Sequence, residues 1–82
     1  MNTTENIIKI LKGLGAIGEI NKTDTLQETI GLDSLGMVML LIELEEAFHI
    51  QLHESDMNPF DLTTVQDVID LIHKYCWGDN HE

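Results

Sequence analysis

Residues 31–48 read GLDSLGMVMLLIELEEAF, and the helical pattern within them decides the fold. Apolar residues recur at helical spacing, which predicts an α-helix from about Ser34 to about Phe48. Asp33 stands where a carboxylate caps a helix N-terminus and where the helix dipole favours negative charge. The core-facing stripe follows an i, i+3, i+4, i+7, i+11 pattern and consists of Met37, Leu40, Leu41, Leu44 and Phe48.

A second apolar set lies on roughly the opposite side of this helix and consists of Leu35, Val38, Met39 and Ile42. A helix in a chain this short has room to bury one broad stripe. One alternative is that the long segment 15–33 covers the second set. The favoured alternative is that the set stays partly exposed and docks a partner, as exposed apolar patches often do. Glu45 and Glu46 would then steer a basic partner toward it.

Two more helices and one helical turn are predicted around the central helix. The first helix ends near residue 14. The last begins at a capping box in which Thr64 and Asp67 satisfy each other's backbone N–H groups. Residues 58–62 are predicted as one helical turn, because Pro59 suits its first position. The predicted fold class is all-α, a small four-helix bundle of three main helices and one short helix.

The segment 15–33 is predicted as a loop of unusual length. Isolated apolar residues are expected to pin this loop to the core, namely Ile17, Ile20, Leu26 and Ile30. Gly31 is expected to form a tight turn before Asp33. The loop would therefore lead directly into the start of the central helix.

The length of 82 residues indicates a single domain over 1–82, with an ordered core at about 3–76 and a polar tail at 78–82. Fifteen Asp and Glu against four Lys and no Arg give a net charge of −11, which excludes the basic footprint that nucleic acid requires. No apolar run reaches the roughly 18 residues of a membrane span. The N-terminus lacks a basic signal region, so we expect a cytoplasmic protein. We also expect a free-standing monomer that does not associate with membranes.

Ser34 lies at the N-terminal edge of the second apolar set. A serine that follows Asp at a helix start is most simply a cap. No His or Lys is close in sequence to activate it, and no Gly-x-Ser-x-Gly elbow surrounds it, so neither a catalytic residue nor an enzyme is predicted. A serine that another enzyme modifies needs only to be exposed beside a docking surface.

A metal site is not predicted. The spaced pairs His49/His53 and His73/Cys76 lack the further ligands that a structural zinc site requires. Scattered histidines near helix ends are the simpler interpretation of these residues.

Three segments together resemble the acyl and peptidyl carrier proteins. They are Gly-Leu-Asp-Ser-Leu-Gly-Met-Val at 31–38, Leu-Glu-Glu-Ala-Phe at 44–48 and Thr-Thr-Val-Gln-Asp-Val-Ile-Asp-Leu-Ile at 63–72. The resemblance covers roughly residues 20–73, and the predicted order of helices agrees with it. Asp-Ser-Leu alone is a weak motif, but its combination with the two later segments in a short acidic chain is specific.

The resemblance implies that Ser34 carries 4′-phosphopantetheine, transferred from coenzyme A by a phosphopantetheinyl transferase. The thiol of this arm would hold acyl or aminoacyl groups as thioesters and present them to loading enzymes, synthases and thioesterases. Asp33 would help to present Ser34 and to bind the transferase. Leu35, Val38 and Ile42 match the family's partner-contacting residues, and Phe60 matches the minor helix that frames the arm.

One departure from the family bears on the pathway. Bacterial fatty-acid carriers usually have acidic residues early on this helix, where the present chain has Gly36 and Met39. The chain is therefore predicted to be a discrete carrier for a polyketide, nonribosomal peptide or other specialised pathway. The alternative is a small acidic helical adaptor that binds a basic protein partner without a prosthetic group.

Overall fold

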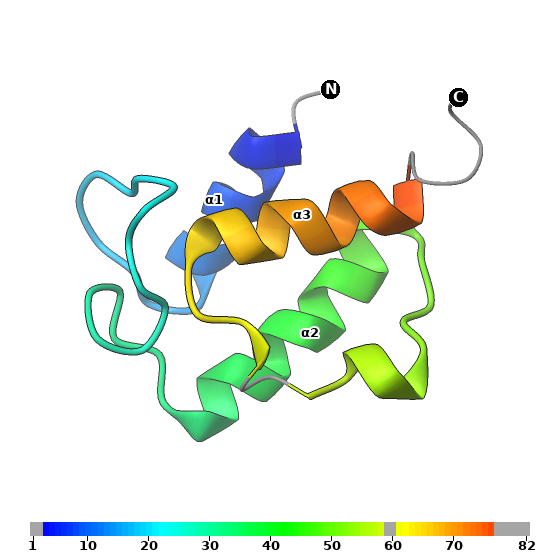
Figure 1. The fold of residues 1–82 in the computed structure, drawn as a ribbon. Helices are drawn as coiled ribbons and strands as arrows, with labels where there is room; N and C mark the ends of the chain where they lie inside the picture. The colour runs from blue at the N-terminus through cyan, green and yellow to red at the C-terminus, as the bar shows by residue number, and fades with distance from the viewer. Residues whose placement is uncertain (1–2, 59–60, 77–82) are drawn as a thin grey trace.

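A computed structural model of the protein describes residues 3–58 and 61–76. Its helices are α1 (Thr3–Gly13), α2 (Ser34–Phe48) and α3 (Val65–Cys76), with a 3-10 helix, η1 (Glu54–Asp56), between α2 and α3 (Figure 1). Within these ranges there is no β-strand, and a bridge pairs Thr25 with Thr64. The fold is therefore all-helical, as predicted.

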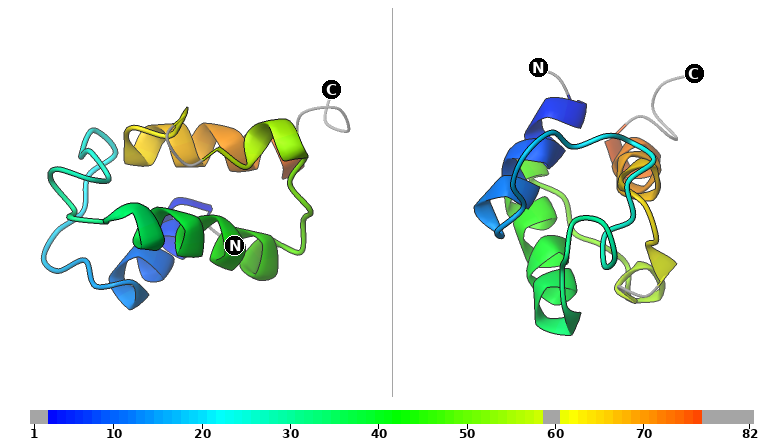
Figure 2. Two further views of the ribbon diagram at one scale, coloured as in Figure 1. Left: turned by 90° about the horizontal axis from the view of Figure 1, so that it is seen from below. Right: turned by 90° about the vertical axis from the view of Figure 1, so that its left-hand side faces the viewer.

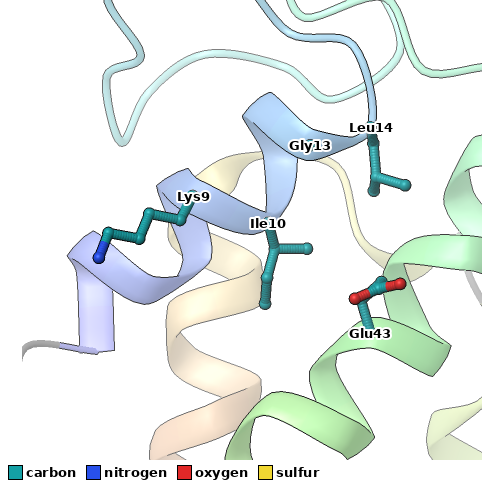
Figure 3. A pocket seen from close by; sticks show the side chains of 5 residues that line it. All are labelled: Lys9, Ile10, Gly13, Leu14 and Glu43. Atoms are coloured by element: carbon teal, nitrogen blue, oxygen red, sulfur yellow. The ribbon is translucent and has the colours of Figure 1, made fainter.

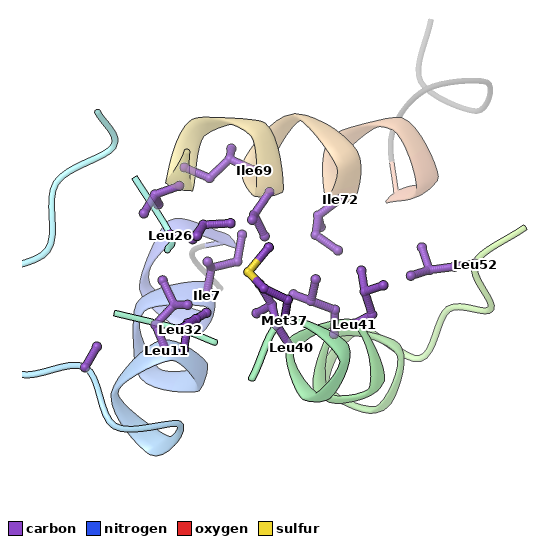
Figure 4. Packing of buried hydrophobic residues seen from close by; sticks show 14 residues of the cluster. Ile7, Leu11, Leu26, Leu32, Met37, Leu40, Leu41, Leu52, Ile69 and Ile72 are labelled. Carbon is purple, nitrogen blue, oxygen red and sulfur yellow. The ribbon is translucent and has the colours of Figure 1, made fainter. Parts of the chain in front are cut away.

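The three α-helices surround one apolar core. α1 contacts both α2 and α3, and the two views of Figure 2 show α2 and α3 on opposite sides of the interior. Figure 4 shows side chains from all three helices and from the connecting segments meeting between them. The fully buried members include Ile7 of α1, Met37 of α2 and Ile72 of α3. Burial of these side chains supplies the main stabilisation of the fold.

α2 has the predicted bounds and the predicted core stripe. Met37, Leu40, Leu41 and Leu44 are at most 1% exposed. Phe48, the last member of the stripe, is only partly buried and packs against the rim of the core. α2 ends where His49 adopts a left-handed conformation with φ of 56°. The core stripe prediction is thus confirmed, with its last residue at the edge.

The start of α3 confirms the predicted capping box. The backbone N–H of Asp67 donates to Oγ1 of Thr64 at 3.2 Å, and the backbone N–H of Thr64 donates to Oδ2 of Asp67 at 3.1 Å. The same carboxylate oxygen accepts from the backbone N–H of Thr63 at 2.9 Å. The backbone N–H of Asp67 also donates to the carbonyl of Thr64 at 3.1 Å. Together these bonds satisfy donors at the N-terminus of the helix.

The long loop between α1 and α2 is held by backbone bonds as well as by its apolar residues. Leu26 is fully buried, and Ile20 and Ile30 pack against the core as predicted. The backbone N–H of Leu26 donates to the carbonyl of Thr63 at 2.9 Å, and that of Val65 donates to the carbonyl of Asp24 at 3.1 Å. The loop is therefore attached directly to the start of α3.

The prediction for Ile17 is wrong, because its side chain is 90% exposed. Gly15 and Gly18 on either side have φ of 119° and 79°, which turn the chain sharply at this point. Within this turn Ala16 takes the inward position and is 6% exposed. Ile17 is left pointing into solvent.

The helical turn predicted at 58–62 is supported by the described residues on either side of 59–60. Asp61 has 3-10 conformation, and its backbone N–H donates to the carbonyl of Asn58 at 3.1 Å. A further 3-10 helix that was not predicted, η1 at Glu54–Asp56, comes before it. Pro59, Phe60 and the predicted tail 78–82 lie outside the described residues.

No helix in the described part of the chain has the length and apolar character needed to cross a membrane.

Candidate functional site

Ser34 is the first residue of α2, and its side chain is exposed. The preceding Asp33 caps the helix as predicted, because its Oδ1 accepts a hydrogen bond from the backbone N–H of Gly36 at 2.7 Å. Just before the cap, Leu32 is buried in the core. The backbone around Ser34 is thus fixed by a buried side chain on one side and by a capped helix on the other.

Gly36 lets this cap close tightly. A Cβ at position 36 would lie 3.2 Å from Oδ1 of Asp33 and 3.3 Å from Cδ2 of Leu32. Either neighbour would have to move to admit a larger side chain. Gly36 therefore contributes to the cap that orients Ser34, in addition to being a departure from the acidic pattern.

The surroundings of Ser34 fit a phosphate ester. Free N–H groups and the helix dipole make a helix N-terminus favourable for an anion. The first turn of α2 contains no acidic residue, and the Asp33 carboxylate beside it is engaged with Gly36. The exposed hydroxyl leaves room for a group that extends into solvent.

The second apolar set forms a patch on α2 that is open to solvent. We name it the α2 patch; it consists of Leu35 (69% exposed), Val38 (42%), Met39 (39%) and Ile42 (42%). The loop 15–33 leaves these side chains accessible. Of the two alternatives that the sequence allowed, exposure is the one found, and the patch begins at the residue after Ser34.

The two acidic residues predicted beside the patch differ in their environments. Glu46 is exposed. Glu45 is partly buried, and its Oε2 accepts a hydrogen bond from the backbone N–H of Leu52 at 2.8 Å. This bond fastens the segment after α2 to the helix, a structural role that no local sequence signal indicates. Phe60, the remaining predicted partner residue, lies outside the described residues.

A polar cluster that the sequence did not reveal joins η1 to the end of α3. The Asp56 cluster consists of His53, Asp56, Lys74 and Tyr75. Lys74 Nζ lies 3.0 Å from Oδ2 of Asp56, and the rings of His53 and Tyr75 are 5.6 Å apart. The hydrogen bond from Tyr75, followed by that from Lys74, lowers the pKa of Asp56. Burial, followed by the bond to Asp56, raises the pKa of Tyr75.

A pocket of about 270 Å³ opens between α1 and α2 (Figure 3). Its lining consists of Lys9, Ile10, Gly13, Leu14 and Glu43. Ser34 and the α2 patch do not contribute to it. Among the described residues, no group of three or more His, Cys, Asp or Glu is placed to hold a metal ion.

Comparison with known proteins identifies the family of the chain. Residues 7–72 match the family described as "Phosphopantetheine attachment site". An acyl carrier protein of Buchnera aphidicola subsp. Baizongia pistaciae (strain Bp) is 36% identical over 78 residues, which cover 93% of this chain and 97% of the relative. The chain therefore belongs to the acyl carrier protein family, whose members bear 4′-phosphopantetheine and act as carriers rather than as enzymes.

Proposed function

We propose that Ser34 is the residue to which 4′-phosphopantetheine is attached. The observation that carries this assignment is an exposed hydroxyl at the capped N-terminus of α2, next in sequence to an open apolar patch. The helix N-terminus stabilises the negative charge of a phosphodiester at that oxygen. When bound, the group supplies a thiol that holds an acyl or aminoacyl cargo as a thioester.

The chain's own residues position the attachment point and recognise partners. Asp33 holds the first turn of α2 closed, so that the Ser34 hydroxyl is presented in one place. The α2 patch supplies the apolar contact surface for the phosphopantetheinyl transferase and for acyl-handling enzymes. Glu46 supplies exposed negative charge, whereas the Glu45 carboxylate is already bonded to Leu52. We further propose that η1 and the turn at 58–61 take the place of the short fourth helix of the bundle.

Mass spectrometry after incubation with coenzyme A and a broad-specificity phosphopantetheinyl transferase tests the attachment site. The wild-type chain should gain one phosphopantetheine group, and Ser34→Ala should gain none. The chain has two serines, so Ser55→Ala, at an exposed position in η1, is the matched control and should be modified like the wild type. An unmodified wild type would reject the assignment in favour of the adaptor alternative. A modified Ser34→Ala would also reject it, by showing that the group is attached to another residue.

We also propose that the carrier serves a specialised pathway, such as polyketide or nonribosomal peptide synthesis, rather than bulk fatty-acid synthesis. The first turn of α2 has no acidic residue, so recognition there depends on apolar contact more than on charge. Identifying the acyl group on the protein purified from its native host tests this proposal. A straight-chain fatty acyl series on Ser34 would contradict it, and a malonyl-derived polyketide or aminoacyl group would support it.

A further inference from the structure

We propose that Met39 is an oxidation site, at which a peroxide converts the thioether to a sulfoxide and thereby weakens partner docking. This inference rests on the proposed function, since it takes the α2 patch to be the docking surface. It adds a chemical modification that would regulate that surface.

The methionine side chains described by the structure differ in how far they are exposed to solvent. Met39 is 39% exposed on the α2 patch, whereas Met37, two residues earlier on the same helix, is fully buried in the core. Met57 is 36% exposed but follows η1 rather than lying on α2. Because a dissolved oxidant must reach the sulfur, Met39 and Met57 should react and Met37 should be protected in the folded protein.

The reaction is balanced with a peroxide as the oxidant. A sulfur–oxygen bond forms as the oxygen–oxygen bond of the peroxide breaks. Sulfur loses two electrons and becomes a sulfoxide, and the other peroxide oxygen leaves as water when hydrogen peroxide is used. Apart from this sulfur, no group on the protein has to donate or accept an electron.

The position of Met39 makes this small change consequential. Its neighbours on the α2 patch, Leu35, Val38 and Ile42, are all aliphatic and exposed. A thioether among them gains from burial against a partner, whereas a sulfoxide must lose hydrogen bonds to water when it is covered. The core would be untouched because Met37 stays reduced, so docking should change without loss of the fold.

The test uses the full chain, treated with hydrogen peroxide and then freed of it. Fragmentation mass spectrometry should find sulfoxide at Met39 and Met57 before Met37, with Val38 separating the two α2 positions in the fragment series. Circular dichroism should show unchanged helix content. The efficiency of phosphopantetheine transfer, measured as kcat/KM of the transferase for the carrier, should fall by about tenfold, the scale expected when one apolar side chain no longer gains from burial.

Two variants assign the effect, each compared with its own untreated sample. Peroxide treatment should leave the transfer efficiency of Met39→Leu unchanged. It should lower the transfer efficiency of Met57→Leu as much as that of the wild type. Both retain Met1, so any effect of oxidising that residue would appear in both. The inference would be overturned if oxidation lowered the transfer efficiency of Met39→Leu as much as that of the wild type, or if it left the wild-type efficiency unchanged. Oxidation of Met37 as fast as Met39 would also overturn it. Transfer to untreated wild type tests the proposed function separately.

Discussion

The hydroxyl of Tyr75 donates a hydrogen bond to Oδ2 of Asp56 at 2.5 Å, across 19 residues of sequence. Lys74 Nζ donates to the same carboxylate, and the backbone N–H of His53 donates to the Tyr75 hydroxyl at 2.8 Å. The Asp56 cluster therefore fastens η1 to the last turn of α3. Because these residues come from separate elements, the cluster forms only when the bundle is assembled.

Asp56→Ala should lower the free energy of unfolding by about 1.5–3 kcal/mol near neutral pH, as expected for lost hydrogen bonds to a charged group. The pKa of Asp56 lies below its ordinary value of 3.8, mainly because Tyr75 and then Lys74 donate to the carboxylate. A lowered pKa stabilises the fold above the ordinary pKa, and this contribution is lost as pH falls toward the folded value. Urea unfolding at a series of pH values should therefore show the difference between wild type and variant shrinking below about pH 4.

Glu54→Ala, at an exposed carboxylate in the same turn, is the control for Asp56→Ala. It should change stability by no more than about 0.5 kcal/mol. If the difference in the free energy of unfolding between wild type and Asp56→Ala stayed constant across the acid range, the carboxylate charge would not be what stabilises the cluster.

Tyr75 should ionise above its ordinary pKa of 10.0, because burial and the bond to Asp56 both disfavour the phenolate. It is the one tyrosine of the chain, so the ultraviolet absorbance of the phenolate reports it alone. A raised pKa contributes stability below the ordinary value that is lost as pH rises through the folded value. The titration midpoint should fall on unfolding in urea and also in Asp56→Ala. Identical midpoints in folded and unfolded protein would refute this expectation.

Glu45→Ala should destabilise the protein by about 1–3 kcal/mol, since the backbone N–H of Leu52 loses its acceptor. Glu46→Ala, one residue later and exposed, should stay within about 0.5 kcal/mol of the wild type. Urea denaturation of both variants provides the measurement. If the two variants are equally stable, water replaces the Glu45 carboxylate with no loss of stability. The bond to Leu52 would then not contribute to the stability of the fold.

Ile42→Asp and Leu44→Ala should separate docking from folding. Ile42 lies on the α2 patch, so Ile42→Asp should lower the kcat/KM of phosphopantetheine transfer and leave helix content intact. Leu44 is fully buried, so Leu44→Ala should cost about 2–5 kcal/mol of stability. Circular dichroism and the transfer assay distinguish them. Loss of helix in Ile42→Asp would mean that this face packs against the protein in solution.

Features determined by local spacing could be predicted from the sequence. The bounds of α2, its buried stripe and the Asp33 cap follow from apolar periodicity and from one carboxylate beside a helix start. The capping box of α3 is likewise contained within four residues. The exposure of the α2 patch followed from a packing argument, because a bundle this small buries one broad face of a helix.

Features that depend on distant partners could not be predicted. The Asp56 cluster joins residues 18 and 19 positions apart, and neither its tyrosine nor its lysine belongs to a recognisable motif. Glu45 looked like another surface acid, because the position of Leu52 becomes known only with the fold. Ile17 was misplaced because apolar character alone does not show that Gly15 and Gly18 turn the chain outward.

The burial of Leu32 immediately before the cap has a consequence for motion. A long loop usually lets the residue at its end swing, but here the last loop residue before Asp33 is held in the interior, and its backbone N–H donates to the carbonyl of Leu26 at 2.9 Å. The backbone at Ser34 is therefore held in place by these contacts. A group attached to Ser34 would move by rotation about its own bonds, and its length would set the volume that it can reach.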